Sequence, residues 1–527
     1  MDIWLCLHER CQVEKKDSFF QLQIQEYPIE DWISGKRLKM PVKQLQRSTP
    51  ERQGVRSEAI LNLINEWEQM RTQDMRQDIH SFMLLRHGYV IAEGWWAPYA
   101  REMQHAMFSM SKSFTSTAVG FAVSEGLLSV EDKAVSYFKE EYPKPAGYLA
   151  QMRIKDLLTM STGQEKEPTT DMIYQAEGDW IKAFFESPVT KEPGKQFLYN
   201  SGATYILSVI VQRVTGQKMI DYLEPRLFAP LGIESPRWNE CPKGYNTGGF
   251  GMWLRTEDIA KFGQLYLNKG AWEERQLLPV QWIEEAAGYQ IDNTGDNPDM
   301  DWRQGYGYQF WRCCHGAYRG DGAYGQFCIV MPEQDMVLVT TAGMCNTGRP
   351  VEAIWNHLLP GVTDKILSED RNTVKLKEKL SSLQVLPPEG RLTRVVLSDG
   401  SNKSEQLTEI EGKKFTLDKN TSEFDYVSFH FQDDSIRMSA GRSGQDVVWN
   451  IGIGYWIKND VTRKGRCNLA FMTGIWQDKN TLLLQSRLVE TPYAIYYKFV
   501  FLDGKVSMES RVNLYFDDTC WDQDLCW

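Results

Sequence analysis

The sequence predicts an α+β domain, in which helices flank an antiparallel sheet and form a lobe beside it, followed by a small all-β barrel or sandwich. Two observations carry this prediction. Strand-like segments stand at both ends of the first 360 residues, with helical patterns grouped between them, and such a chain folds into a sheet with an adjoining helical lobe. Beyond residue 385 only strand-like alternation recurs, which is typical of a barrel or sandwich.

After the first 50 residues, the α+β part of the chain opens with a helix and a hairpin. Apolar residues follow helical spacing over 57–70, which predicts a helix. Strands are expected over 81–86 and 89–95, joined by His87-Gly88, because glycine suits a tight hairpin turn. The further helices are expected over 109–124, 154–160, 180–185, 203–214 and 350–359, and the late strands over 306–312, 324–331 and 336–341.

Beyond residue 385 the sequence alternates in strand fashion. Asp503-Gly504 is a strong hairpin signal between two of these strands. The expected strands are 426–431, 447–451, 481–488, 494–502 and 506–511. No catalytic motif occurs among them.

A chain of 527 residues is too long for one ordinary core. We divide it into an N-terminal extension (1–50), the α+β domain (51–364), a charged linker (365–384) and the all-β domain (385–527). In the extension, Phe19, Phe20, Leu22 and Ile24 are candidates for an added strand or a partner contact. The sequence leaves the oligomeric state open.

Composition narrows the classes of partner. The net charge of −11 argues against a nucleic-acid or anionic-membrane partner, so a small substrate fits better. Charged residues interrupt the apolar start of the chain, and no run of eighteen apolar residues occurs, so neither a signal peptide nor a membrane span is expected. The ten cysteines are scattered, which indicates reduced thiols and a cytoplasmic protein. Cys520 and Cys526 are a weak pair, and neither a metal nor a cofactor is expected.

The most informative motif is Ser109-Met110-Ser111-Lys112. A serine and a lysine three residues apart lie on one face of a helix, so the lysine amine can reach the hydroxyl and activate it as an acyl-transfer nucleophile. The same spacing occurs at Ser136 and Lys139, where a solvated surface stretch is the simpler interpretation. Ser109 is favoured because small residues follow it along a helix that can pack tightly in a core.

A second proton-transfer group is expected at Tyr199, in a polar loop that follows a Pro-Gly turn and precedes a helix. Tyrosine becomes a useful base only if a nearby cation lowers its pKa, and Lys112 is the candidate for that charge. The alternative is a packed aromatic residue. Tyr266, which precedes Asn268 in a similar pattern, is expected to be core.

The late segment from Tyr318 to Phe327 is rich in glycine. Gly320, Asp321 and Gly322 are candidates to supply a backbone N–H that completes an oxyanion hole with the N–H of Ser109. By itself the segment reads equally as a hairpin turn.

Taken together, the motifs resemble a known family. Residues 109–115, 157–163, 197–202 and 322–327 (SMSKSFT, LLTMSTG, FLYNSG and GAYGQF) resemble the serine hydrolases related to class C β-lactamases, D-alanyl-D-alanine carboxypeptidases, esterases of the family and 6-aminohexanoate-dimer hydrolase. The resemblance covers roughly residues 50–360. It implies a β-lactamase/transpeptidase-like fold, acylation of Ser109, proton transfer by Lys112 and Tyr199, and a late strand that lines the oxyanion hole.

Two departures from the family pattern bear on the substrate. Ser201 stands where β-lactamases and peptidases often have asparagine, and Arg319 is the nearest replacement for the late-strand cation that grips a substrate carboxylate. The resemblance therefore implies a carboxylesterase or small-amide hydrolase rather than a potent β-lactamase. A peptidase for D-amino-acid peptides and a non-catalytic binding module remain the alternatives. If Arg319 pairs with Asp321 instead of facing a substrate, acidic and neutral substrates should respond alike to its removal.

Overall fold

The computed structural model describes residues 44–174, 178–295, 299–387, 409–420, 422–432, 434–442, 444–463 and 466–514. These fall into two compact units, of which the first holds residues up to 95 together with 101–383, and the second holds 96–100 together with the chain from 384 onward. The candidate strand at Phe19–Ile24 and the pair Cys520 and Cys526 lie outside the described residues.

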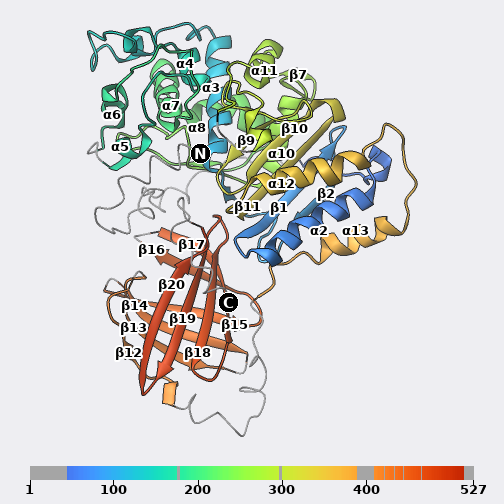
Figure 1. Ribbon diagram of the computed structural model, residues 1–527, viewed down its shortest axis with the longest axis vertical. Coiled ribbons are helices and arrows are strands. Elements are labelled where there is room, and N and C mark those ends of the chain that lie inside the picture. Colours follow the sequence, from blue (N-terminus) through green and yellow to red (C-terminus); the bar gives the residue numbers. More distant parts are fainter. Residues whose placement is uncertain are drawn as a thin grey trace. The chain divides into compact units, whose positions relative to one another are not determined.

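A six-stranded antiparallel sheet with the order β2-β1-β11-β10-β9-β8 organises the first unit (Figure 1). The early hairpin and the late strands therefore meet in one sheet, as the sequence predicted. Its strands are β1 (Gln77–Arg86), β2 (Tyr89–Trp95), β8 (Trp311–Arg312), β9 (Tyr318–Gly322), β10 (Gln326–Met331) and β11 (Met336–Met344). Short strands β3 (His105–Ala106), β4 (Arg237–Trp238) and β5 (Met252–Leu254) form a second sheet, and β6 (Ala271–Trp272) pairs with β7 (Arg275–Gln276).

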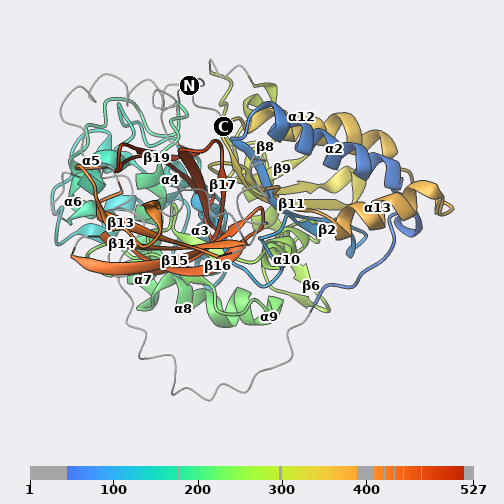
Figure 2. The ribbon, with the colours of Figure 1, turned by 90° about the horizontal axis from the view of Figure 1, so that it is seen from below.

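Helices cover both faces of the large sheet. The helices are α2 (Ser57–Gln73), α3 (Ser111–Ser124), α4 (Ile154–Leu158), α5 (Thr169–Tyr174), α6 (Trp180–Glu186), α7 (Ser201–Thr215), α8 (Met219–Leu223), α9 (Ala229–Leu231), α10 (Thr256–Leu267), α11 (Val280–Ala287), α12 (Gly348–Ala353) and α13 (Arg371–Ser381). Trp67 of α2 contacts Phe82 of β1, with ring centroids 5.8 Å apart. Gly263 of α10 approaches Val337 of β11 so closely that an added Cβ would lie 2.6 Å from it. Figure 2 shows α2, α12 and α13 on one side of the sheet and α10 on the other, which explains why every residue of β1 is buried.

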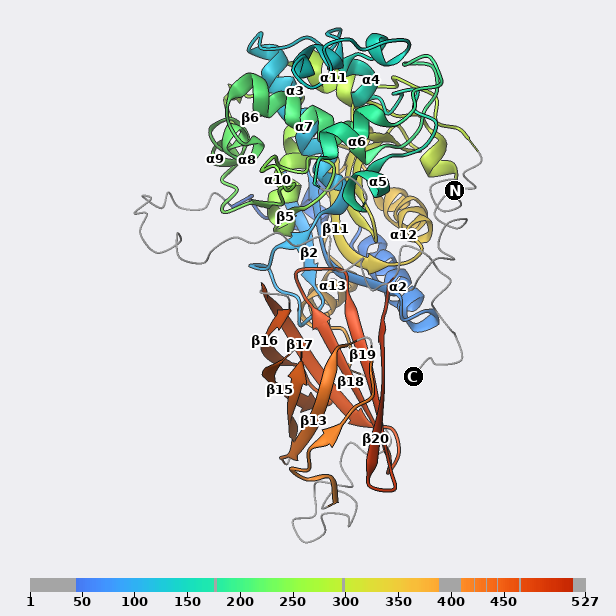
Figure 3. The same cartoon turned by 90° about the vertical axis from the view of Figure 1, so that its left-hand side faces the viewer.

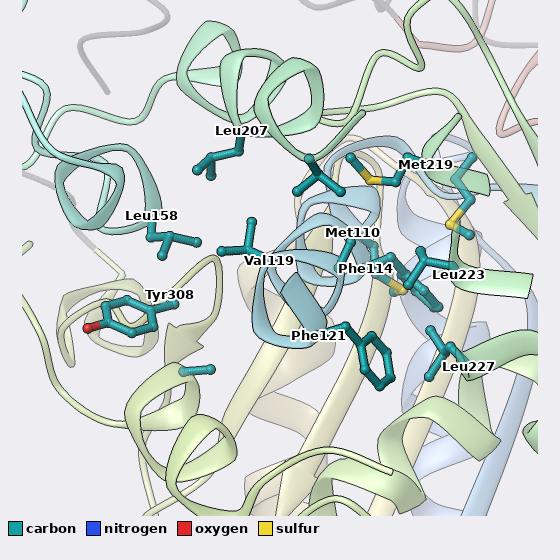
Figure 4. Close-up of a cluster of buried hydrophobic side chains, with 14 of the residues drawn as sticks. Met110, Phe114, Val119, Phe121, Leu158, Leu207, Met219, Leu223, Leu227 and Tyr308 are labelled. Atoms are coloured by element: carbon teal, nitrogen blue, oxygen red, sulfur yellow. The ribbon is translucent and has the colours of Figure 1, made fainter. Parts of the chain in front are cut away.

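Helix α3 is the central element of the helical lobe. Every residue from Ser111 to Ala122 is buried, and its small residues allow neighbouring helices to approach. Figure 4 shows Phe114, Val119 and Phe121 of α3 among apolar side chains of the helices around it, such as Leu207 and Leu223. A helix held on all sides in this way fixes the residues at its N-terminal end.

The late strand expected over 306–312 is confined to Trp311 and Arg312. The preceding backbone is engaged elsewhere, since the N–H of Tyr306 donates to Ile291 and that of Tyr308 to Ala286. The glycine-rich segment forms strand β9, which joins β10 in a hairpin. Tyr324 and Gly325 turn that hairpin with φ values of 68° and 90°.

The charged segment 365–384 differs from the linker that we expected. Residues 371–381 form helix α13, which is capped by Asp370 through its side chain to the N–H of Asn372 and packs on α2. Leu376 is buried, so a single apolar stripe suffices to hold an otherwise charged helix against the unit.

The second unit is a nine-stranded, nearly closed barrel, with a sheet order of β12-β13-β14-β15-β17-β18-β19-β20 and β16 paired to β17 (Figure 3). Lys413, before β12, donates to the carbonyl of Gly504, and the hydroxyls of Ser422 and Ser510 are 2.8 Å apart, so the first and last strands lie close together. Asp503 and Gly504 form the predicted turn. The strands are β12 (Phe415–Thr416), β13 (Phe424–Phe431), β14 (Ser435–Arg442), β15 (Gln445–Ile453), β16 (Ile457–Arg463), β17 (Arg466–Trp476), β18 (Thr481–Leu488), β19 (Ala494–Leu502) and β20 (Lys505–Val512).

Candidate active site

Ser109 is displayed by a tight turn in front of α3. The 3₁₀ turn Phe108–Met110 leads directly into the helix, and between His105 and Ala122 Ser109 alone is not buried. Phe108 has a φ of 48°, a left-handed conformation that costs a bulky residue free energy and is often found at functional sites. The ring of Phe108 packs edge-on against Tyr324, with centroids 5.4 Å apart. The turn therefore holds the serine hydroxyl at an accessible point of an otherwise buried segment.

Lys112 reaches Ser109 as the spacing predicted. Its Nζ donates to Ser109 Oγ at 3.0 Å, to Ser201 Oγ at 2.9 Å and to the carbonyl of Gly249 at 2.8 Å, which uses all three protons of the ammonium group. Burial, opposed by the carboxylates of Glu167 and Asp321, lowers the pKa of Lys112 to about 7. Near neutral pH a large fraction of the lysine is therefore an uncharged amine that can accept the proton of Ser109.

Tyr199 lies beside both groups, but not with the electrostatics that we expected. Its hydroxyl interacts with Ser109, and Lys112 Nζ lies 4.8 Å from the centre of its ring. Burial raises the pKa of Tyr199, the hydrogen bond with Ser109 opposes this rise, and Asp321 and Glu167 add to it. The expectation that Lys112 would lower this pKa is wrong, because Lys112, with a pKa of about 7, is uncharged over the pH range in which a tyrosine titrates. The phenol therefore stays protonated and can donate a proton.

Ser201 begins helix α7 and joins it to the site. Asn200 caps the helix by accepting from the N–H of Ala203 at 2.9 Å, and the N–H of Ser201 donates to Glu167 Oε1 at 3.0 Å. The Ser201 hydroxyl accepts from Lys112. In this structure the serine at the position often held by asparagine thus contacts the lysine.

The late strand β9 runs against the turn that carries Ser109. A Cβ at Gly322 would lie 2.2 Å from the carbonyl oxygen of Met107, and one at Gly320 would lie 2.9 Å from Ser113 Oγ. Both positions therefore need glycine for the strand to approach this closely. The approach brings the backbone of Gly320, Asp321 and Gly322 next to the nucleophile turn.

Arg319 is fully buried on the opposite face of β9. Its Nε donates to Asp321 at 2.8 Å, its Nη1 pairs with Asp301, and Trp302 lies under the guanidinium, 3.9 Å from the ring centre. The structure thus places Arg319 in the ion-paired alternative that the sequence left open, with its charge directed at two carboxylates of the protein.

Aromatic side chains form a wall beside Tyr199. Its ring stacks on Trp311 with centroids 5.5 Å apart, and Trp311 in turn contacts Phe197 and Tyr306. Tyr199, Trp311 and Phe197 are only partly buried, so apolar surface borders the serine.

Sequence reasoning missed several contributors. Glu167, four residues after the motif at 157–163, and the carbonyl of Gly249 contact residues of the site, and Asp301 pairs with Arg319. None of the three belongs to a motif, and no local pattern marks them. The two competing motif matches lie elsewhere. Ser136 is exposed in a surface turn, and Tyr266 is buried in the core, where its hydroxyl lies 2.7 Å from that of Thr117.

Within the described ranges, no group of three or more His, Cys, Asp or Glu side chains is arranged to hold a metal ion. Cys241, Cys313, Cys314, Cys328 and Cys345 carry thiols and are not joined in disulfide bonds.

No helix among the described residues is long and apolar enough to cross a membrane.

Comparisons with known proteins agree with the motifs. The family model described as Beta-lactamase matches residues 72–354, more than half of the chain. The 6-aminohexanoate-dimer hydrolase of Paenarthrobacter ureafaciens is 25% identical over 365 residues, which cover 64% of this chain and 91% of that protein. Among solved structures, an octameric penicillin-binding protein homologue from Pyrococcus abyssi (TM-score 0.46, 16% identity) covers 85% of this chain and 99% of its own. EstCE1, a hydrolase with promiscuous acyltransferase activity, has a TM-score of 0.48 and 15% identity, over 56% of this chain and 98% of its own. The chain belongs to the β-lactamase family of serine hydrolases.

Proposed function

We propose that the protein hydrolyses a small ester or amide through an acyl-enzyme on Ser109. The observation that supports this most strongly is the partly exposed Ser109 hydroxyl, 3.0 Å from a buried Lys112 amine whose pKa is about 7. Acyl transfer needs a nucleophile and a nearby base that can accept the proton of that nucleophile near neutral pH.

The chemistry follows from the contacts. Neutral Lys112 takes the proton of Ser109 while the serine oxygen attacks the substrate carbonyl, and backbone N–H groups of Ser109 and of the segment Gly320–Gly322 stabilise the oxyanion. Tyr199, kept protonated by burial, donates a proton to the leaving alcohol or amine, and Lys112 returns the proton to the phenolate. Water then attacks the acyl-enzyme, gives up a proton through the same groups and releases the acid.

Two features bear on the substrate. Arg319 is committed to Asp301 and Asp321, so it does not supply the cation that grips a substrate carboxylate in β-lactamases and carboxypeptidases. The partly exposed rings of Phe197, Tyr199 and Trp311 favour an apolar group near the serine. A neutral carboxylic ester or a small amide therefore fits the site better than a β-lactam or a D-alanyl peptide. Similarity to a relative named 6-aminohexanoate-dimer hydrolase agrees with a small substrate.

Hydrolysis of p-nitrophenyl esters by matched serine variants tests this proposal. Ser109→Ala should reduce turnover to background while circular dichroism stays unchanged, because it removes the atom that accepts the acyl group. Ser136→Ala, which removes an exposed serine with the same spacing to a lysine, should keep full activity. Full activity in Ser109→Ala would contradict the proposal. An inactive wild-type protein across esters, amides and a D-alanyl peptide would favour a non-catalytic binding module.

A further inference from the structure

Glu167 is a carboxylate near Lys112 that the proposed mechanism does not use. One oxygen accepts from the backbone N–H of Ser201 at 3.0 Å and from the hydroxyl of Thr169, and the other accepts from the N–H of Thr169 at 3.0 Å. The carboxylate therefore sits at the N-terminal end of the fifteen-residue helix α7, where free N–H groups and the helix dipole favour a negative charge.

Ser201 links Glu167 to Lys112, the proposed base. Ser201, whose backbone Glu167 holds, offers its hydroxyl to Lys112 Nζ at 2.9 Å. A carboxylate, a serine and a lysine amine thus follow one another in a chain of contacts that ends on Ser109 Oγ. Displacement of Glu167 would leave the N–H of Ser201 without this acceptor and so loosen the hold on one of the three acceptors that orient Lys112.

We propose that Glu167 is a positioning residue for the hydrolase reaction, which anchors Ser201 as an acceptor for Lys112 and stabilises the protonated form of the lysine amine. This inference rests on the proposed function of Ser109 and Lys112. Without the carboxylate, the buried amine would lose its proton at a lower pH, because a negative charge nearby favours the ammonium form.

The other groups around Lys112 set the size of the effect. Asp321 is a second carboxylate that favours the charged amine, but Arg319 neutralises much of it. The ring centre of Tyr199 lies 4.8 Å from Lys112 Nζ, and Ser109, Ser201 and the carbonyl of Gly249 are uncharged acceptors. Burial raises the pKa of the Glu167 carboxyl, while the hydrogen bonds from Thr169 and Gly202 and the charge of Lys112 oppose that rise. Among the described residues, Arg319 pairs with Asp321 and no arginine forms an ion pair with Glu167, so the charge of Glu167 is the less compensated of the two near Lys112.

The test is the pH dependence of kcat/KM for p-nitrophenyl acetate between pH 5 and 9. Glu167→Gln removes the charge but keeps an oxygen that can accept from Ser201, so the plateau should stay within about tenfold of wild type. The midpoint of the acid limb should move to lower pH by about half a unit or more. The exposed Glu165 lies two residues earlier, and Glu165→Gln should leave the profile where it is.

The pH profile of Glu167→Asp provides a second, independent test. This variant keeps the charge but withdraws it by one methylene, so its acid limb should fall between those of wild type and Glu167→Gln; this comparison decides the matter should the glutamine variant not fold. An unchanged midpoint in the Glu167 variants, or an equal shift in Glu165→Gln, would overturn the inference. Failure of the proposed function would look different, since wild type itself would then show no hydrolysis that depends on Ser109.

Discussion

At the scale of single residues, burial decides which group carries the proton. Lys112 and Tyr199 both lie against Ser109, yet burial acts on them in opposite directions, because it disfavours the charged form of each. It lowers the pKa of the lysine to about 7 and raises that of the tyrosine. The lysine is therefore suited to accept the proton of the serine, and the tyrosine to donate one.

The pH profile should report the lysine. Only the neutral amine can accept the proton of Ser109, so kcat/KM for an ester should rise with pH through a midpoint near 7 and level off above it, where Lys112 is unprotonated. An exposed lysine would place the midpoint near 10.4, and a carboxylate base would place it near 4. Steady-state kinetics across this range distinguishes the three, and a midpoint near either of the last two values would contradict the role of Lys112.

Arg319 should matter for stability more than for substrate choice. Arg319→Ala leaves Asp301 and Asp321 without their buried counterion, and breaking such a pair costs about 3–5 kcal/mol. Chemical denaturation should show a loss of this order, whereas Arg275→Ala, at an exposed site on β7, should cost little. Where the variant folds, KM should change equally for an ester with a free carboxylate and for its methylated counterpart. A selective rise for the acidic ester would show instead that Arg319 contacts the substrate.

At the scale of elements, the site depends on how closely β9 approaches the turn before α3. Gly322→Ala would place a Cβ 2.2 Å from the carbonyl oxygen of Met107, and neither backbone can yield without moving the strand. We expect kcat to fall by about 10²-fold or more, the usual cost of losing one oxyanion donor. Gly295→Ala is a suitable control, since an added Cβ there would find its nearest neighbour 4.0 Å away. Normal kcat in Gly322→Ala would remove β9 from the oxyanion hole.

Local sequence patterns predicted individual helices, strands and turns better than they predicted which elements pack or pair with one another. Helix α2, the hairpin of β1 and β2 and the turn at Asp503-Gly504 follow from periodicity and turn chemistry, which are written in adjacent residues. Helix α13 escaped detection because charged side chains surround its one apolar stripe. Strands β16 and β17 were also missed, since a strand without clear alternation is recognised only by its pairing. Strand β14 was missed although Ile436, Met438 and Ala440 alternate along it.

At the scale of the whole molecule, the contacts of the site also divide into those that are local in the sequence and those between distant segments. The contact between Ser109 and Lys112 was predictable, since positions three apart lie on one face of a helical turn. The acceptor carbonyl of Gly249 lies 137 residues from Lys112, and Glu167 lies 34 residues from Ser201. Such contacts depend on how distant loops fold together, so no single stretch of sequence encodes them. We propose 51–364 and 385–527 as the two domains; α13, which lies between these ranges, groups with the first unit.

The most direct test of the account is to trap the acyl-enzyme and locate it. Wild-type protein treated with a fluorophosphonate, or quenched in acid during turnover of a slow ester, should gain one adduct by intact mass, and peptide mapping should place it on Ser109. Ser109→Ala should gain none, and pre-labelling should abolish hydrolysis in proportion to the fraction modified. An adduct on Ser136, or active wild-type protein that hydrolyses esters without any adduct on Ser109, would contradict the account.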